Sequence, residues 1–142
     1  MSEARLREYM LKNIDDQGHF CRVEAHDSQP GIPDISYTIQ GFNGWIELKY
    51  GSRGKPPVLR KMQWVWFRRN VKQGGNPLIF VGIQGMETTR YGLIHGSKYD
   101  DLYRHRSILP WINAMDRHWD GQVRWPEFLY ALKCPKSLLT RR

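Results

Sequence analysis

The chain has 142 residues, of which 40% are hydrophobic and 25% charged, a composition that fits one compact domain and excludes a largely disordered polypeptide. No apolar run is long enough to span a bilayer, and the N-terminal residues lack the apolar segment of a secretory signal. We therefore expect a cytoplasmic protein with no membrane partner. Two cysteines, Cys21 and Cys134, are too few for a disulfide framework or a cysteine-rich zinc site, and the histidines lack metal-ligand spacing, so we expect no zinc.

The charge is strongly basic, with 22 lysine and arginine residues against 14 acidic ones and a formal net charge of +8. No acidic residue occurs between Glu47 and Glu87. The basic residues of this stretch are Lys49, Arg53, Lys55, Arg60, Lys61, Arg68, Arg69 and Lys72. A solvated basic face is one interpretation, but such an excess attracts polyanions, and its interruption by Gly and Pro disfavours a membrane-binding helix. The pattern therefore favours nucleic acid as the partner.

The first half of the chain predicts a helix followed by three strands. Residues 3–14 carry apolar side chains at helical spacing, and Ser2 is placed to cap them. Residues 19–26 alternate between apolar and polar side chains, which indicates a half-buried strand. Two further strands are predicted at residues 34–40 and 45–50. The dipeptide Asn43-Gly44 between them is a strong hairpin signal.

The second half predicts alternating helices and strands and then a less regular region. The expected elements are a helix at about Val58–Lys72, a buried strand at 77–84, a short strand at 91–95 and a helix at 97–106 capped by Ser97. Because the first of these helices separates two strands, a right-handed parallel crossover is expected between them. From Leu109 onward the chain is rich in tryptophan, and we expect it to pack as one or two helices over the sheet.

The order helix, three strands, helix, strand predicts an α/β fold with a central mixed sheet flanked by helices. We expect residues 1–142 to form a single domain. Its core spans about residues 1–96, and a helical, Trp-rich extension spans about 97–142.

The residues that carry chemistry lie on the two strands of the predicted hairpin. Glu47 and Lys49 are two positions apart, so both side chains leave the same face of their strand. Leu48 points into the core, and its backbone carbonyl remains free as a possible metal ligand. Asp34 begins the partner strand at the same side of the hairpin. Glu-x-Lys is also a common solvated ion pair, but this strand is otherwise apolar, which favours a site.

Two carboxylates and a lysine suit phosphodiester hydrolysis. This reaction needs a hard cation to polarise the phosphoryl oxygen, a water that is deprotonated nearby, and compensation for the negative charge of the transition state. Asp34 and Glu47 could hold Mg²⁺ or Mn²⁺, because these ions prefer oxygen ligands. Lys49 could orient or deprotonate the water, or neutralise the developing charge.

The motif Gly31-Ile32-Pro33-Asp34, followed by a hairpin and by Ile46-Glu47-Leu48-Lys49, resembles the signature of the PD-(D/E)XK nuclease superfamily. The chain also resembles the VRR-NUC branch and the related phage and archaeal Holliday junction resolvases in Lys55–Pro57, in Gln63 early in a helix, and in Gly74-Gly75 before a buried strand. The resemblance covers roughly residues 1–85. It implies a restriction-endonuclease-like αβββαβ core in a bacterial, archaeal or phage-infected cell.

The resemblance also implies a role for each matching residue. Asp34 and Glu47 would bind the metal, and Lys49 would be the catalytic lysine. Gln63 would lie at the helix start, near the metal or the scissile phosphate. An exposed amide on the helix surface is the alternative interpretation of Gln63.

A further acidic residue is implied, because members of the superfamily carry a glutamate on the first helix that reaches the site. Glu3 is the best candidate, and its competitors are Glu8 on the same helix and Glu24 on the first strand. His26, at the end of that strand, could contact phosphate or be an ordinary loop histidine.

The predicted DNA-binding surface is the loop after the catalytic strand together with the helix that follows. Arg53 and Lys55 lie directly beyond that strand, in place for phosphates that flank a cut. The helix adds the basic residues Lys61, Arg68, Arg69 and Lys72. Its aromatic residues keep helical spacing, which favours core packing over base stacking.

These features predict a Mg²⁺- or Mn²⁺-dependent DNA endonuclease that recognises branched DNA, such as a Holliday junction, by shape. We expect a homodimer, because a resolvase cuts two strands symmetrically. The alternative is a repair, restriction-like, flap or single-strand nuclease on the same core. A non-catalytic nucleic-acid-binding protein is a third possibility, which the intact Asp34, Glu47 and Lys49 disfavour.

Overall fold

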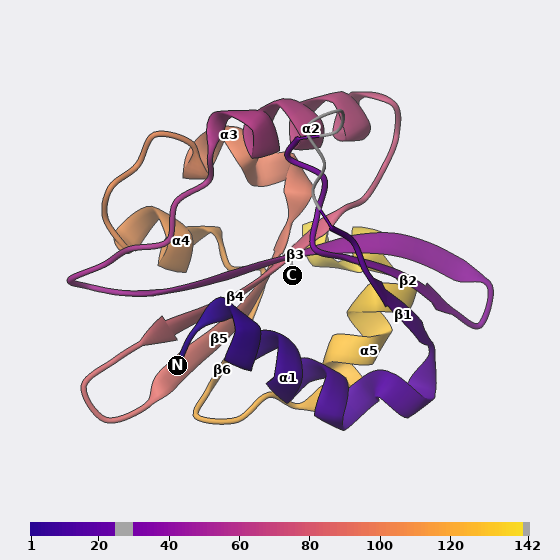
Figure 1. The fold of residues 1–142 in the computed structure, drawn as a ribbon, viewed down its shortest axis with the longest axis horizontal. Coiled ribbons are helices and arrows are strands. Elements are labelled where there is room, and N and C mark those ends of the chain that lie inside the picture. The colour runs from indigo at the N-terminus through magenta and orange to yellow at the C-terminus, as the bar shows by residue number, and fades with distance from the viewer. Residues whose placement is uncertain (25–29, 141–142) are drawn as a thin grey trace.

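The computed structural model of the chain describes residues 1–24 and 30–140. In this part of the chain six strands form one mixed sheet in the order β1-β2-β3-β4-β5-β6, and helices flank both of its faces (Figure 1). The strands are β1 (His19–Arg22), β2 (Ile35–Ile39), β3 (Phe42–Ser52), β4 (Leu78–Gln84), β5 (Thr89–His95) and β6 (Arg117–Asp120). Neighbouring strands are antiparallel except β3 and β4, which run parallel. The predicted α/β fold with a mixed sheet is confirmed.

The helices alternate with these strands along the chain. They are α1 (Glu3–Ile14), α2 (Lys61–Lys72), α3 (Tyr99–Leu102), α4 (Leu109–Ala114) and α5 (Trp125–Lys133), with short 3₁₀ turns η1 (Asp15–Gln17), η2 (Gly96–Lys98) and η3 (Pro135–Leu139). The order α1-β1-β2-β3-α2-β4 is the predicted αβββαβ core. Within the described residues no helix has the length and apolar character needed to cross a membrane.

The helix α1 follows the sequence prediction closely. The Ser2 hydroxyl accepts a hydrogen bond from the Arg5 N–H at 3.2 Å, which satisfies one of the free donors at the helix start. The apolar stripe Leu6, Met10 and Ile14 is buried against the sheet. The helix therefore begins and ends at the predicted residues because its cap and its apolar periodicity agree.

The β2–β3 hairpin turns at a different place from the one predicted. Its two loop residues are Gln40 and Gly41, both with positive φ (49° and 84°), between the paired residues Ile39 and Phe42. Such a two-residue loop needs positive φ at both positions. Gly44 lies within β3 instead, and it is a glycine for another reason: a Cβ there would lie 2.4 Å from the Tyr37 hydroxyl. The prediction of a turn at Asn43-Gly44 is wrong.

Two predicted boundaries are also corrected. The strand predicted at 19–26 ends as a paired strand at Arg22, and its last two positions lie outside the described residues. The helix predicted from Val58 begins at Lys61, because Leu59 is held extended by a bridge to Tyr103. The connection from β3 through α2 to β4 is parallel, as predicted.

The C-terminal region departs most from the prediction. The helix predicted at 97–106 is reduced to η2 and α3, ends at Leu102, and begins at a turn capped by His95, whose ring accepts from the Ser97 N–H at 3.1 Å. The extension predicted as helical contains the strand β6, which adds Trp119 to the sheet beside β5. A strand of four residues is too short to show a clear sequence pattern. Its backbone pairs here with the outer edge of β5.

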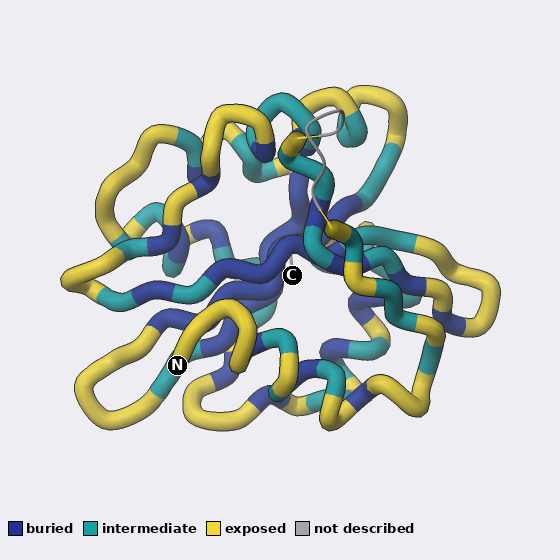
Figure 2. Tube along the Cα trace, viewed as in Figure 1, coloured by how far each residue is buried: buried dark blue, intermediate teal, exposed yellow. Residues whose placement is uncertain are grey.

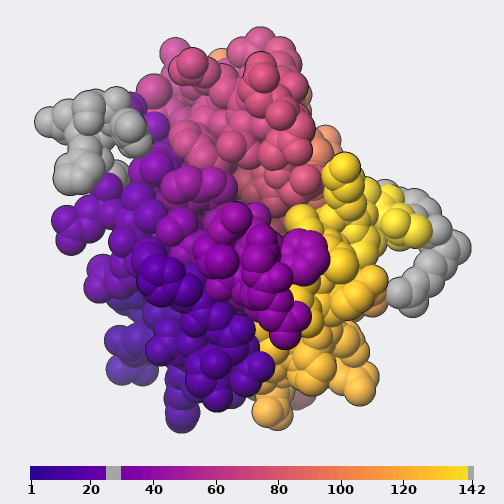
Figure 3. Space-filling view, turned by 90° about the vertical axis from the view of Figure 1, so that its right-hand side faces the viewer, coloured from indigo at the N-terminus to yellow at the C-terminus, as the bar shows by residue number. Residues whose placement is uncertain are grey.

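The last helix anchors this region on the hairpin. The Tyr37 hydroxyl of β2 donates to the Leu132 carbonyl of α5 at 2.6 Å. Figure 3 shows the C-terminal residues packed directly against the segment that contains the β2–β3 hairpin. The extension is therefore part of the same packed body as the αβββαβ core.

Each face of the sheet has its own hydrophobic core. The helices α1 and α5 cover one face, over Leu48, Leu78 and Phe80, whereas α2, α3 and α4 cover the other, over Ile79 and Val81. Figure 2 shows the buried residues concentrated in the central strands. The strand β4 is buried over six of its seven residues, as expected for a parallel strand covered on both faces.

Phe80 tests the first of these cores. It is fully buried and lies 4.9 Å from Phe128 and 6.1 Å from Tyr91, measured between ring centroids. Phe80→Ala is expected to lower the free energy of unfolding by about 3–5 kcal/mol, because it leaves a cavity between α5 and the sheet. Phe42→Ala, at a half-exposed site on the same sheet, is the control and should cost under about 1 kcal/mol. Equal losses in denaturant unfolding would contradict this core assignment.

Candidate active site

Glu47 and Lys49 lie side by side on the face of β3 that α2 covers. They sit in register with Ile79 and Val81 of β4, whose side chains belong to the core on that same face. Each is only 2% exposed, and the Lys49 ammonium lies 3.5 Å from the Glu47 carboxylate. Two ionisable side chains are therefore buried at the centre of the sheet, where desolvation penalises their charged forms.

Gln63 of α2 joins both members of this pair. Its amide N–H donates to Glu47 Oε2 at 2.8 Å, and its Oε1 accepts from Lys49 Nζ, also at 2.8 Å. The same Oε1 accepts from the Arg60 N–H at 3.0 Å, at the start of the helix. Gln63 is 4% exposed, so the interpretation of it as a surface amide is wrong. One side chain thus caps α2 and holds the buried pair.

Asp34 reaches the same place from the end of β2. The pairing of β2 with β3 ends at Ile35 and Ile46, and the Leu48 N–H two residues further along donates to Asp34 Oδ2 at 2.8 Å. The N–H and C=O of one residue point to the same edge of a strand. The Leu48 carbonyl is therefore directed to the edge where Asp34 lies.

Glu47 has one carboxylate oxygen without a partner. Within the described residues, its buried Oε1 makes no hydrogen bond. Burial, together with the negative charge of Asp34, raises the pKa of Glu47 to about 8, and Lys49 opposes the shift. An oxygen that is buried, unpaired and close to a second carboxylate is suited to binding a cation.

Glu3 lies close enough to this cluster for the charges there to affect its pKa. Desolvation raises the pKa of Glu3, and the charges that act on it are Lys49, Asp34 and Arg60. Glu3 in turn contributes to the raised pKa of Glu47. Neither Glu8 nor Glu24 is among the groups whose charges act on Glu47 or on Glu3. The geometry therefore brings Glu3, rather than either competitor, to the cluster.

The donors fit an oxygen-preferring divalent ion. Across residues 1–24 and 30–140, no three His, Cys, Asp or Glu side chains converge at metal-binding spacing. Mg²⁺ is usually held by only one or two carboxylates and keeps several waters. Asp34, the free oxygen of Glu47 and the Leu48 carbonyl provide that kind of set, whereas no thiol or imidazole is among them.

The predicted DNA-binding residues that the structure describes lie on the turn after β3 and along α2, outside this cluster. Arg53 is exposed in a tight turn that is closed by two backbone hydrogen bonds between Ser52 and Lys55, of 3.0 and 3.2 Å. The exposed basic residues of this turn and of α2 are Arg53, Lys55, Lys61, Arg68, Arg69 and Lys72. His26 lies outside the described residues.

Arg60 is a residue near the cluster that the sequence alone does not identify, except as one member of the basic stretch. Arg60 stands at the start of α2, and its charge acts on Glu3. If the helix began at Val58, as predicted, Arg60 would lie inside it and not at its cap position. The signal that could have found it is the spacing Arg60-x-x-Gln63, in which a glutamine at the third helical position reaches back to the cap residue.

Gly31 fixes the Asp34 loop against α2. Its φ is +85°, and a Cβ there would lie 2.1 Å from the Met62 carbonyl oxygen and 2.8 Å from the Gln63 nitrogen. The loop backbone therefore touches the helix backbone next to Gln63, and only glycine allows this contact. The loop that carries Asp34 and the helix that carries Gln63 are set relative to each other here.

Gly31→Ala is expected to destabilise the protein. The left-handed conformation alone costs an L-residue about 1–2 kcal/mol, and the contact with the Met62 carbonyl adds to this. Gly54→Ala is the matched control, because a Cβ at Gly54 meets nothing within 4 Å. The measurement is the free energy of unfolding of both variants. If Gly31→Ala lowers it no more than Gly54→Ala does, the contact between the loop and α2 is dispensable.

Comparisons with known proteins give a distant likeness. No family model and no curated protein sequence matches the chain. The solved structure of Hjc, a Holliday junction resolvase from the archaeal hyperthermophile Archaeoglobus fulgidus, is similar at 20% sequence identity. The alignment covers 73% of this chain and 83% of that chain, with a TM-score of 0.40. The function of this chain is therefore inferred from its own side chains.

Proposed function

We propose that this chain is a divalent-metal-dependent DNA endonuclease with Asp34, Glu47 and Lys49 at its catalytic centre. The observation that carries the proposal is the buried Glu47–Lys49 pair with one Glu47 oxygen left unpartnered beside Asp34. A buried ion pair is often less stabilising than apolar residues of the same size, and an unpaired oxygen adds to that cost. Strongly perturbed carboxylates of this kind concentrate at functional sites.

The residues that would hold Mg²⁺ or Mn²⁺ are Asp34, Glu47 through Oε1, and Leu48 through its backbone carbonyl. The ion would polarise a phosphoryl oxygen and offset the negative charge that develops during hydrolysis. The hydrogen bond from the Leu48 N–H to Asp34 Oδ2 orients this carboxylate, and its other oxygen, which accepts no hydrogen bond from the described residues, could bind the ion.

Lys49 is held ready to act on a water or on the phosphate. Its ammonium has three N–H donors, and two of them are directed at Gln63 Oε1 and Glu47 Oε2. The third can donate to an attacking water or to a non-bridging phosphate oxygen. Gln63 positions this ammonium and the Glu47 carboxylate together, so it acts as a positioning residue.

Glu3 and the basic surface complete the proposed site. Glu3 stands near Asp34 and Lys49 at the exposed side of the cluster, where it can take part in binding a water or the ion. The exposed Arg53 and Lys55 follow the catalytic strand directly and can bind phosphates on either side of the cut. Such contacts recognise the DNA backbone and its shape rather than its sequence.

The substrate we propose is branched DNA, such as a four-way junction, cut by a homodimer. Among the described residues no separate domain for reading bases accompanies the core, and the basic surface is built to contact phosphates. Two symmetric cuts across a junction require two copies of the site. A nuclease that acts on flaps, single strands or linear duplex is the second candidate, because the same centre would serve it equally well.

Cleavage assays with a four-way junction, a flap and a linear duplex separate these candidates. With Mg²⁺ or Mn²⁺ we expect paired nicks across the junction, and with EDTA no cleavage. Cleavage confined to the flap or to single strands would transfer the proposal to the second candidate. Binding of all substrates with cleavage of none would leave a non-catalytic DNA-binding protein.

Asp34→Asn is expected to reduce cleavage by at least roughly 100-fold while DNA binding is retained, because it removes a ligand charge from the metal site. The amide oxygen of asparagine can still accept from the Leu48 N–H, so the fold should persist. Asp15→Asn, at an exposed position just after α1, is the control. Rate constants measured under single-turnover conditions test this, and unchanged cleavage by Asp34→Asn would exclude the proposed centre.

The raised pKa of Glu47 predicts a pH-dependent stability in the metal-free protein. The native carboxyl titrates near pH 8 and the unfolded one near its ordinary value of 4.5. Between these values the unfolded chain releases its proton and the native protein keeps it, so the free energy of unfolding should fall as the pH rises through this window. Adding Mg²⁺, which binds the ionised form, should therefore stabilise the protein more at pH 8 than at pH 5.5.

Denaturant unfolding in EDTA across this pH range is the measurement, with Glu47→Gln as the control. The variant cannot titrate at this position, so its stability should fall less steeply and respond less to Mg²⁺. Parallel curves for the two proteins would mean that Glu47 is not the titrating group.

A further inference from the structure

The segment from Tyr103 to Ser107 lies next to the proposed DNA-binding surface, although it is distant from it in the sequence. Tyr103 pairs in a parallel bridge with Leu59, in the stretch that leads from the catalytic strand into α2. In Figure 1 the loop that joins α3 to α4 lies on the same side of the sheet as α2. The C-terminal extension thus places its own residues beside Arg60 and the start of α2.

A stack of aromatic rings fixes this segment on α2. The Tyr103 ring stacks on Trp64 with 5.0 Å between centroids and an angle of 18°. The Trp64 indole N–H donates to Asp100 Oδ1 at 2.6 Å, which orients the ring and occupies that carboxylate. The segment is therefore held in place by packing that involves half-buried rings.

Two arginines extend this stack at its surface. The Arg68 guanidinium lies 5.3 Å from the centre of the Trp64 ring, and that of Arg104 lies 5.1 Å from the centre of the Tyr103 ring. Both are within cation–π distance. A guanidinium that stacks on an aromatic ring keeps N–H groups at its edge that can donate to phosphate oxygens.

The local backbone and charge also single out this segment. Arg104 adopts φ = 68°, a left-handed conformation that is uncommon for a residue other than glycine. Residues 104–107 are all exposed. Between Asp101 and Asp116 the chain has no acidic residue, and this stretch includes Arg104, His105 and Arg106. The acidic residues nearest to Arg104 in sequence are Asp100 and Asp101 of α3. Asp100 is bonded to Trp64, whereas Asp101 is exposed.

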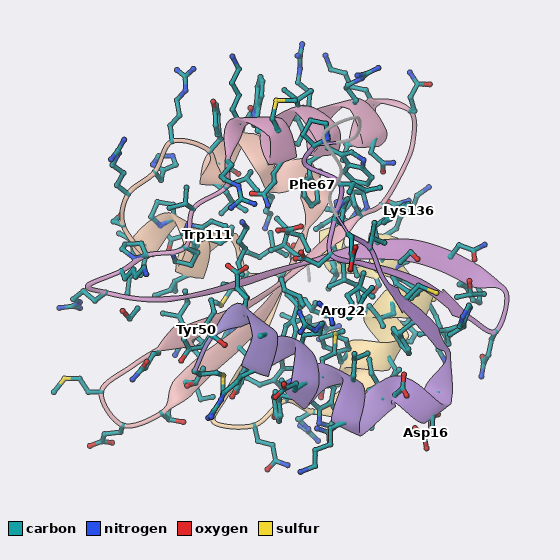
Figure 4. The ribbon with its side chains drawn as sticks, viewed as in Figure 1. Asp16, Arg22, Tyr50, Phe67, Trp111 and Lys136 are labelled. Atoms are coloured by element: carbon teal, nitrogen blue, oxygen red, sulfur yellow. The ribbon has the colours of Figure 1, made fainter. Side chains whose placement is uncertain are left out.

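We infer that residues 104–106 form a second phosphate-binding segment, which extends the basic surface of α2 and binds the DNA backbone away from the catalytic centre. The inference rests on the proposed function, since it assigns a role of the C-terminal extension in binding that substrate. Figure 4 shows long side chains that end in nitrogen projecting from α2 and from the α3–α4 loop. A duplex arm that reaches the proposed catalytic centre would then contact two basic segments, α2 and residues 104–106.

The test is DNA binding by the double variant Arg104→Asn/Arg106→Gln, measured by fluorescence anisotropy in EDTA over a series of salt concentrations. Asparagine tolerates the left-handed conformation, so the backbone at residue 104 is preserved. Because the variant can no longer neutralise two phosphates, we expect affinity to fall by roughly 10-fold and the slope of log K against log salt to decrease by about 2.

The control is Lys12→Gln/Arg124→Gln, which removes the same charge from two exposed positions on α1 and at the start of α5, over the opposite face of the sheet. Its affinity and salt slope should stay near those of the unmodified protein. Equal losses in both variants would overturn the inference, because net charge alone would then explain them. Unchanged binding by the Arg104 and Arg106 variant would overturn it too.

These outcomes are separate from those of the proposed function. Binding in EDTA does not depend on the metal or on cleavage, so the inference can hold for a protein that never cuts DNA. Conversely, a protein that cuts branched DNA with Mg²⁺ and binds it equally well without Arg104 and Arg106 would retain its proposed function and lose this segment.

Discussion

The side chain of Gln63 couples the helix α2 to the strand β3, and the rest of the candidate site depends on this contact. One amide donates to Glu47, accepts from Lys49 and also accepts from the backbone at the start of its own helix. Two ionisable side chains can remain buried here because these hydrogen bonds replace part of the water that each has lost. The position of α2 over the sheet and the geometry of the site are therefore set by the same interaction.

The end of the β2–β3 pairing decides where Asp34 meets β3. The pairing of β2 with β3 stops at Ile35 and Ile46, and the Leu48 N–H, two residues beyond the last pair, donates to the Asp34 carboxylate instead of to a backbone carbonyl. A side chain thus substitutes for a backbone partner at this edge of β3. Gly31 keeps the loop that carries Asp34 in direct contact with α2. A rigid helix, a central strand and a tightly packed loop thus hold the polar groups without requiring flexibility from any of them.

The C-terminal extension is integrated with this framework on both faces of the sheet. Strand β6 extends the sheet beyond β5, and α5 joins the β2 strand through the Tyr37–Leu132 hydrogen bond. On the opposite face Tyr103 packs on Trp64 and pairs with Leu59, just before the helix that carries Gln63. The C-terminal extension, which has no recognisable motif, therefore packs against α2 through Tyr103 and adds basic residues next to it.

The sequence by itself determined the elements whose local signals agree: α1 with its Ser2 cap, the buried strand β4, the parallel crossover, and the placement of Glu47 and Lys49 on one face of β3. These follow from short-range periodicity and capping. Tertiary structure alone decided the rest. Gly44 lies inside a strand opposite Tyr37, whose side chain leaves no room for a Cβ at residue 44, and β6 pairs with the outer edge of β5. Gln63 is buried, and Glu3 rather than Glu8 or Glu24 approaches the cluster, because of where α1 and α2 cross the sheet. Contacts between residues distant in sequence carry no local pattern, so only the assembled fold reveals them.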